Sequence, residues 1–427
     1  MRIVLAQKYF YRGGGTATYL LALVEELKRR GHECIPFTVG YEQTVSKEYW
    51  DYYVSPPAGD DTTHLRNMRL SPWQMMKLLG RATWSTEAYR KALKLVDDTK
   101  PDIAYVLNIY SYMSPSPISA FRKRGLPVVM RVADYNMVCP ELHLFRSGRP
   151  CEECLDHGLF RALRYRCHKG SLASTAARVF AMTFHNLVRA YDAVDRFIIP
   201  AAYMRDLLVR GGYDSAKIQH IPSFYEGSAA AAQSTPDTQY ILYFGRLAPE
   251  KRLDILVRAQ SLIPDAPPLW LAGGDVDGEQ ARLQALSESC GATVRFLGHQ
   301  DREQLDSLIA NALFTVVPSN CYDNCPMSVL ESFAHGKPVI GSAIGGIPEQ
   351  IAGDSGLLFE PGSAESLTVQ MEALLADPAR RERMGEAARL RLQTVFNPAR
   401  HCDALLEAFD QVIAAKRAKR NAIHDPT

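Results

Sequence analysis

The sequence has 427 residues, 47% of them hydrophobic, and a formal net charge of +2 at pH 7. A chain of this length is expected to form two or three domains, and its balanced charge excludes the strong basic excess typical of nucleic-acid-binding proteins. Residues 1–6 lack the basic and long apolar segments of a signal peptide, and no apolar run in the sequence is long enough to span a bilayer. We therefore expect a cytoplasmic protein.

The first half of the chain alternates between strand and helix patterns. Residues 2–6 form an apolar strand pattern, residues 13–15 are glycines, and apolar residues recur at helical spacing over 20–27. Further apolar segments typical of buried strands are residues 34–38, 103–107, 128–132 and 197–200. This alternation predicts a doubly wound α/β domain with a parallel sheet.

The glycine loop comprises Gly13, Gly14 and Gly15 and is followed by Thr16. Glycines let the backbone approach a ligand closely, Thr16 can cap the following helix, and amides at a helix N-terminus bind anions. The loop is therefore either a phosphate-binding loop or an ordinary tight turn.

Residues 68–95 combine large apolar and basic side chains. Trp73, Met76 and Trp84 are interleaved with arginines and lysines such as Lys77 and Arg81. Such a segment either lies on an anionic membrane surface or forms a helix that packs on the core with a basic outer side. The first interpretation predicts peripheral contact with the cytoplasmic face of the inner membrane.

Nine cysteines in a chain without a secretory signal favour thiols or a metal site over a disulfide framework. Four of them cluster in one region, residues 139–167: Cys139, Cys151, Cys154 and Cys167. The close pair can clamp one ion, and the outer two can complete a tetrahedral thiolate site for structural zinc. The alternatives are buried reduced thiols, or a site in which His157 or His168 replaces one cysteine.

Polar residues follow two strands of the predicted first domain. Asn108 follows one strand, while Arg131 and Asp134 follow the next. In open α/β sheets the carboxyl ends of strands line the ligand crevice, so these are candidate binding residues. Asp134 can accept or orient a proton there, or it can cap the turn before Tyr135.

Residues 223–239 are rich in Ser, Ala, Gly and Pro and are interpreted as a linker. A strand pattern at 240–244 then opens a second domain, and Arg246 and Lys251 follow it within one loop. Arginine offers a forked contact and lysine a compact charge, so the pair suits two phosphates. The alternative is a solvated charge cluster. Further strand patterns are residues 269–272, 294–297 and 314–317.

A polar loop and a short helix follow the last of these strands. Pro326 stands at the start of the helix, and apolar residues then recur at helical spacing up to Gly336. The free amides of the first turn form an anion site, bracketed by the carboxylates of Asp323 and Glu331. The alternative is an exposed helix that carries two ordinary acids.

These motifs resemble the donor site of the family 4 retaining glycosyltransferases, also called glycosyl transferases group 1. The resemblance lies in Asp323-x7-Glu331, the following His-Gly-Lys-Pro and Gly-Gly-Ile-Pro-Glu segments, and Arg246-x4-Lys251. The family has glutamate at Asp323, glycine at Arg252, and in many members histidine at Ala133. A cysteine-bearing insertion like that of residues 139–167 occurs in a subset of the family.

The resemblance implies the GT-B fold, in which two Rossmann-like domains face each other across a cleft. We expect an acceptor domain at 1–222, a linker at 223–239, a nucleotide-sugar domain at 240–400, and a helix at 401–421 that crosses back to the first domain. The implied acceptor residues are Asn108, Arg131 and Asp134. The implied donor residues are Gly14, Gly15, Arg246, Lys251, Gly298, His299, Asp323, Asn324, Cys325, Pro326, Met327 and Glu331.

In this family Glu331 corresponds to the residue that binds the ribose, and Asp323 to the one that contacts the sugar. The implied reaction moves a sugar from a nucleotide diphosphate sugar to a hydroxyl of a carbohydrate or lipid-linked acceptor, with retention and without a catalytic metal. The catalytic candidates are Arg246, Lys251, Asp323 and Asp134. The alternatives are a sugar-nucleotide epimerase of the same fold and a non-catalytic carbohydrate-assembly paralogue.

Overall fold

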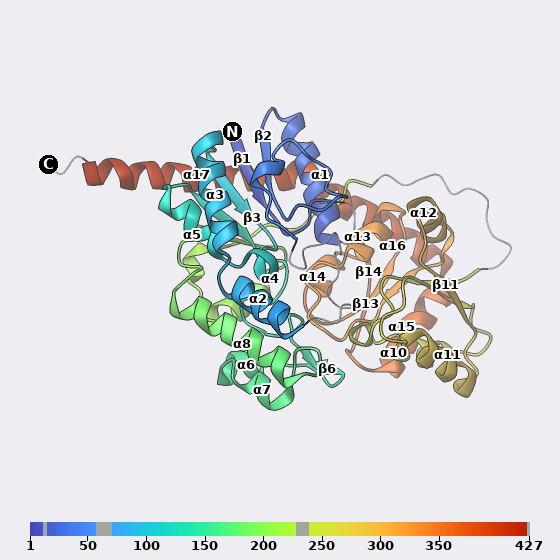
Figure 1. The fold of residues 1–427 in the computed structure, drawn as a ribbon. Helices are drawn as coiled ribbons and strands as arrows, with labels where there is room; N and C mark the ends of the chain where they lie inside the picture. The colour runs from blue at the N-terminus through green and yellow to red at the C-terminus, as the bar shows by residue number, and fades with distance from the viewer. Residues whose placement is uncertain (12–14, 57–70, 228–238, 425–427) are drawn as a thin grey trace.

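A computed structural model describes residues 1–11, 15–56, 71–227 and 239–424. Two six-stranded parallel sheets, each flanked by helices, form two Rossmann-like domains that lie side by side (Figure 1). Their strand orders are β2-β1-β3-β4-β7-β8 and β11-β10-β9-β12-β13-β14. The predicted GT-B fold class is confirmed.

The first sheet is buried on both faces, as expected for a parallel sheet covered by helices. Its central strands β3 and β4 are buried at every residue. The six strands are β1 (Arg2–Ala6), β2 (Glu33–Phe37), β3 (Ile103–Val106), β4 (Val128–Arg131), β7 (Arg196–Ile199) and β8 (Ile218–His220). Strand β8 was not predicted, because three residues are too few to show a pattern.

The second sheet places its most buried strands at its centre. Strands β9 and β12 are buried at every residue, whereas the edge strand β11 is half-exposed. The six strands are β9 (Ile241–Phe244), β10 (Leu269–Ala272), β11 (Val294–Gly298), β12 (Thr315–Val317), β13 (Val339–Ser342) and β14 (Gly356–Phe359).

The helices connect successive strands and cover both faces of each sheet. Those of the first domain are α1 (Gly15–Arg29), α2 (Pro72–Thr83), α3 (Thr86–Thr99), α4 (Tyr110–Met113), α5 (Ser116–Lys123), α6 (Glu153–His157), α7 (Arg161–Tyr165), α8 (Leu172–Leu187) and α9 (Met204–Arg210). Those that follow are α10 (Leu253–Ser261), α11 (Glu279–Cys290), α12 (Arg302–Asn311), α13 (Met327–Ala334), α14 (Ile347–Gln350), α15 (Ala364–Ala376), α16 (Pro378–Thr394) and α17 (Pro398–His424).

The last helix, α17, starts beside the second domain and runs across the first (Figure 1, red). Its residues Leu405, Phe409 and Val412 belong to the same core cluster as Leu5 and Tyr105 of the first sheet. The Phe409 ring lies 5.5 Å from the Tyr105 ring, measured between centroids. The end of the chain therefore completes the core of the first domain.

The basic and aromatic segment at 68–95 forms two helices, although residues 57–70 lie outside the described part. Helix α3 packs on the core through Ala88, Ala92 and Leu95, so the core-facing interpretation holds for this half. Helix α2 differs, because Trp73 is 72% exposed and Met76 is 63% exposed. Among the described residues, no helix is both long and apolar enough to cross a membrane.

Candidate active site

A cavity of about 650 Å³ lies between the two domains at the carboxyl ends of β4, β9 and β12. Residues from both domains line it, as expected for a ligand crevice in α/β folds. The predicted residues that line it are Gly15, Arg131, Asp134, Arg246, Lys251, His299, Asp323, Asn324, Cys325, Pro326, Met327 and Glu331. Gly14 lies outside the described residues.

Two further predicted residues lie behind the cavity wall. Asn108 donates from Nδ2 to the Asp134 carboxylate at 3.1 Å, so it acts on the cavity through Asp134. The Gly298 carbonyl accepts from the Gly273 amide at 2.7 Å, and Gly273 lines the cavity. Asn108 and Gly298 therefore each form a hydrogen bond with a residue that lines the cavity.

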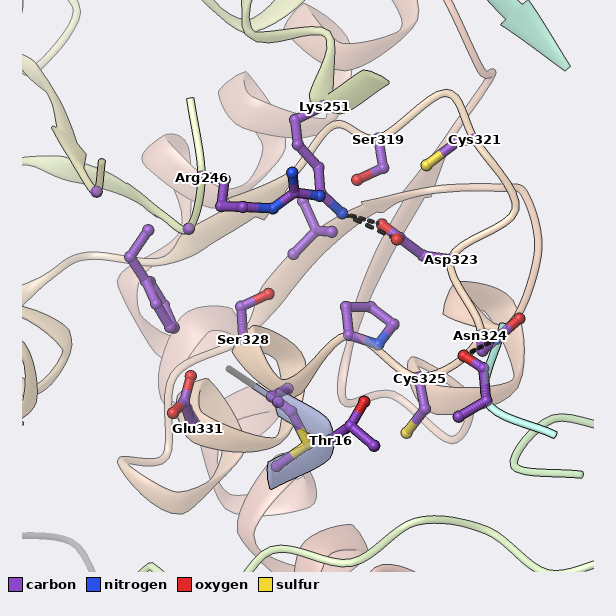
Figure 2. Close-up of a pocket in the computed structure, with 18 of the residues that line it drawn as sticks. Thr16, Arg246, Lys251, Ser319, Cys321, Asp323, Asn324, Cys325, Ser328 and Glu331 are labelled. Carbon is purple, nitrogen blue, oxygen red and sulfur yellow. Dashed lines mark hydrogen bonds and ion pairs between the residues drawn. The ribbon is translucent and has the colours of Figure 1, made fainter. Parts of the chain in front are cut away.

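Lys251 and Asp323 form an ion pair inside the cavity, shown by the dashed lines in Figure 2. Lys251 Nζ lies 2.9 and 2.7 Å from the two Asp323 carboxylate oxygens, and the side chains are only 18% and 19% exposed. Burial disfavours both charges, but their mutual attraction outweighs it. The pKa of Asp323 is therefore lowered and that of Lys251 is raised.

Arg246 reaches the same cavity from the loop after β9 (Figure 2). Its guanidinium donates to Glu250 at 2.8 Å, and the Tyr243 hydroxyl holds its backbone carbonyl, also at 2.8 Å. The Arg246 side chain lines the cavity and is 55% exposed. An anion that enters the cavity can therefore contact the buried cation of Lys251 and the more exposed cation of Arg246.

Glu331 lies on α13. In Figure 2 it is near the bottom of the view, whereas Lys251 is near the top. Arg302 Nη1 donates to its carboxylate at 2.9 Å, and Arg302 is held in turn by Asp306 on the same helix and by Tyr225. Burial raises the pKa of Glu331, although Arg302 opposes this shift. Arg302 was not predicted from the sequence, because no motif spacing relates it to Glu331.

Asn324 joins the two domains beside the cavity. Its Nδ2 donates to the Ala133 carbonyl at 2.7 Å, and its Oδ1 accepts from the hydroxyls of Tyr135 and Tyr203. Nearby, the Glu349 carboxylate accepts from the amide of Tyr203 at 2.9 Å. These contacts fix the loop of Asp323 and Asn324, which we call the 323–324 loop, against the first domain.

The 323–324 loop also needs glycine at Gly345 and Gly346. Gly345 has a φ of +63°, and a side chain on Gly346 would lie 1.9 Å from the Asn324 carbonyl oxygen. Backbone atoms cannot yield to a β-carbon at that distance, so only glycine lets the loop of Asp323 and Asn324 pack here. This is a physical reason for the Gly-Gly-Ile-Pro-Glu segment.

Asp134 and Arg131 form the first-domain wall. Asp134 accepts from the Asn136 amide at 3.0 Å, so it caps the turn and lines the cavity at once. Burial raises the pKa of Asp134, which makes its carboxylate a better proton acceptor. Arg131 donates to Ser223 Oγ at 2.6 Å and stacks on the Tyr19 ring, with its guanidinium carbon 3.9 Å from the ring centroid.

The four clustered cysteines are free thiols in this structure. Burial and the neighbouring thiols raise the pKa of Cys154 to about 12, and burial raises that of Cys167 to about 11. Within the described residues, no group of three or more His, Cys, Asp or Glu side chains is arranged to hold a metal ion. The predicted structural zinc site is therefore not supported.

The insertion of residues 139–167 is tied to the second domain at its hairpin, β5 (Phe145–Arg146) and β6 (Arg149–Pro150). The Gly148 carbonyl at the hairpin turn accepts from Arg252 Nη1 at 3.1 Å and from Asn320 Nδ2 at 3.0 Å. Arg252 is the residue that replaces the family's glycine. Its side chain therefore has a structural partner in the insertion.

Two family models match the chain, one in each domain. The Glycosyl transferase 4-like domain matches residues 14–223, and Glycosyl transferases group 1 matches residues 228–391. The chain belongs to the group 1 glycosyltransferases. The resemblance read from the motifs of the second domain is thus confirmed at the level of the family, while membership of the cysteine-bearing subset stays a prediction.

Curated relatives of this group 1 glycosyltransferase match over part of their length. A sulfoquinovosyl transferase of Arabidopsis thaliana is 27% identical over 216 residues, which cover 47% of this chain and 41% of the relative. A D-inositol 3-phosphate glycosyltransferase of Mycolicibacterium gilvum is 29% identical over 245 residues, 53% of this chain and 54% of the relative. The chain spans about half the length of the curated relatives it matches.

Solved structures share the whole fold at low sequence identity. A sucrose-phosphate synthase of Thermosynechococcus elongatus superposes with a TM-score of 0.70 at 20% identity, covering 97% of this chain and 99% of its own. Anabaena HepE in complex with UDP-glucose superposes with a TM-score of 0.64 at 15% identity, covering 96% of this chain and all of its own. These likenesses support the fold of this group 1 glycosyltransferase.

Proposed function

We propose that this chain transfers a hexosyl group from a nucleotide diphosphate sugar to a hydroxyl acceptor. The observation that carries the proposal is the pair Asp323 and Glu331, which brackets the start of α13 in the cavity that Arg246 and Lys251 enter. Carboxylates can accept hydrogen bonds from the ribose and sugar hydroxyls, while the cations and helix amides hold two phosphates. The solved complexes of Anabaena HepE with UDP and with UDP-glucose support this class of donor.

The proposed reaction stabilises the leaving diphosphate by charge. The bond from the anomeric carbon to the diphosphate oxygen breaks, and negative charge on that oxygen is held by Arg246, Lys251 and the amides of α13. The acceptor oxygen attacks the same face, so the configuration is retained, and its proton passes to the leaving phosphate oxygen. Asp134 orients the acceptor hydroxyl. In this scheme protein cations do the work that a divalent metal does in other transferases.

A change at Glu331 tests the donor site directly. Ligand that binds only the folded state stabilises it by about 2.7 kcal/mol at a 100-fold excess over Kd. We expect wild type to gain thermal stability from one series among UDP, GDP, ADP and their sugars, and Glu331→Gln to lose that gain because the ribose contact is gone. Thermal-shift measurements check this, with Glu386→Gln, an exposed position on α16, as the matched control.

The outcomes of that experiment separate the candidate functions. No shift with any nucleotide in wild type contradicts the transferase proposal and favours a paralogue without donor binding. A shift accompanied by conversion of the donor sugar in the absence of acceptor favours an epimerase. A shift without that conversion, lost in Glu331→Gln and kept in Glu386→Gln, supports the donor site of the transferase, and transfer to an added acceptor then separates the transferase from a paralogue that binds the donor without product.

The acceptor class that we propose is a lipid-linked intermediate at an anionic membrane surface. Helix α2 packs beside α8, where His185 Nε2 lies 2.8 Å from the Thr83 carbonyl oxygen. The outer side of α8 is also apolar, since Phe180 is 58% exposed and Leu187 is 79% exposed. Neither helix contains Asp or Glu; of their basic residues, Lys77 is exposed, whereas Arg81 and Arg178 are part-buried and donate to other groups of the protein. An apolar surface with only positive charge fits an anionic bilayer.

This membrane surface, formed by α2 and α8, predicts a binding defect. The double variant Trp73→Ser, Phe180→Ser should bind vesicles at least about tenfold more weakly than wild type, because each side chain loses roughly 1.5–3 kcal/mol of apolar burial. Co-sedimentation with vesicles of equal phosphatidylglycerol and phosphatidylcholine measures the effect. The matched control is Leu390→Ser, a 60% exposed leucine on α16. Wild type that stays in the supernatant with these vesicles would refute the membrane surface.

A further inference from the structure

The cysteine-bearing insertion brings one polar side chain into the cavity that no motif had marked. His143 lines the cavity together with Ala133, Asp134 and Asp323. It interacts electrostatically with both Asp134 and Asp323, so it lies within range of the first-domain wall and of the 323–324 loop. His143 is exposed, which means that its ring faces open space instead of packing in the core.

The backbone holds His143 in this position. Its two neighbours, Leu142 and Leu144, have positive φ angles of 77° and 49°, which residues with a β-carbon rarely adopt. The Leu142 carbonyl accepts from the Tyr135 amide at 3.3 Å, and the Leu144 carbonyl accepts from the Cys151 amide at 2.7 Å. Unfavourable conformations on both sides, fixed by hydrogen bonds, are typical of residues placed for a function.

The insertion is also fixed from the far side of the cavity. Gly148, at the turn of the hairpin that follows Leu144, is held by Arg252 and Asn320 of the second domain. The His143 loop is therefore anchored to both domains. A ring carried by such a segment keeps its place while the donor lies in the cavity.

Ala133, just after β4, lines the cavity where an imidazole could stand. The resembled family carries histidine at this position in many members, and here a methyl group lines the same cavity as His143. An imidazole can donate a hydrogen bond to a sugar hydroxyl or accept one from it, whereas the alanine side chain can do neither. The first-domain side of the cavity therefore has an imidazole from the insertion instead of from the residues after β4, in addition to His299 of the second domain.

We propose that His143 contacts the hexosyl group of the donor, hydrogen-bonding a ring hydroxyl between Asp134 and Asp323. The inference rests on the proposed function, since it names a residue for the sugar half of that donor site. It assigns the insertion a part in substrate recognition. In this arrangement the phosphates and ribose do not touch His143, so its contribution is confined to the sugar.

The test compares binding of a nucleotide with binding of its sugar by isothermal titration calorimetry. The probes are UDP with UDP-glucose and GDP with GDP-mannose, applied to wild type and His143→Ala. We expect the nucleotide alone to bind both proteins equally, and the nucleotide sugar to bind His143→Ala about five- to tenfold more weakly, the loss of one hydrogen bond. His157→Ala, an exposed histidine elsewhere in the insertion, is the matched control and should bind like wild type.

A second variant guards against a merely structural effect. Adding Ala133→His to His143→Ala should restore most of the affinity for the nucleotide sugar, because it returns an imidazole to the cavity. Equal loss for nucleotide and nucleotide sugar, or no loss for either, would overturn the role of His143 while leaving the donor site intact. Wild type that binds neither these four probes nor ADP and ADP-glucose would instead overturn the proposed function itself.

Discussion

Replacing Lys251 with methionine should lower the free energy of unfolding by about 3 kcal/mol. It should also slow the cleavage of the sugar donor, which liberates the nucleotide diphosphate, at least about 100-fold. The stability loss arises because Asp323 stays in the cavity wall without its counter-charge. The expected loss of about 3 kcal/mol is at the low end of the range for breaking a buried ion pair, since both side chains are about a fifth exposed. The rate loss arises because the leaving diphosphate loses a fixed cation. Urea denaturation and a nucleotide-release assay measure the two effects.

The double variant Lys251→Met, Asp323→Asn separates these effects. Removing both charges should recover most of the stability but none of the turnover, because the diphosphate still lacks its cation. A double variant as unstable as the single one would contradict the pairing argument, and a fully active single variant would contradict the role of Lys251. Lys123→Met, an exposed lysine on α5, controls for the substitution itself.

The ion pair of Lys251 and Asp323 also makes the stability of the protein depend on pH in the acidic range. The folded-state pKa of Asp323 lies below its ordinary value, so its contribution to stability is present above that ordinary value and is lost as pH falls through the lowered one. Wild type should therefore lose more stability on acidification than the double variant does.

Phe409→Ala in α17 should cost about 3–5 kcal/mol of stability, the usual loss when a large aromatic residue is truncated in a core. The Phe409 side chain is completely buried and packs beside Tyr105 of the first sheet. Three of the four tryptophans, Trp50, Trp73 and Trp84, precede the linker, so urea denaturation followed by tryptophan fluorescence reports mainly on this domain.

Lys419→Ala provides the control for that experiment, because Lys419 is an exposed residue of the same helix. It should change stability by less than about 0.5 kcal/mol, as surface substitutions usually do. A similarly small effect of Phe409→Ala would show that α17 is not part of the core in solution.

The fold was predictable because its signals are local. Apolar runs such as 103–107 and 240–244 coincide with observed strands, and the cavity residues from Arg246 to Glu331 follow strand ends that the sequence marks clearly. Parallel strands bring their carboxyl ends to one edge, so loops far apart in the chain had to meet there.

The rest depended on contacts between segments without any shared spacing. Arg302 reaches Glu331 from another helix, and His143 enters the cavity through a loop with two positive φ angles. Neither geometry follows from residue type. The zinc prediction rested on the cysteine spacing and on the polar loop between the cysteines, and neither determines whether the thiols are arranged to hold an ion, which is not seen among the described residues.

The position of α17 also bears on how the protein is made. Synthesis proceeds from the N-terminus, and domains generally begin to fold as they emerge from the ribosome. Here Leu5 and Tyr105 are translated early, yet the residues that cover them, Leu405 and Phe409, are translated near the end. The first domain must therefore wait, with an apolar face uncovered, until the second has been synthesised, and a nascent chain stalled before Pro398 would present that face to chaperones.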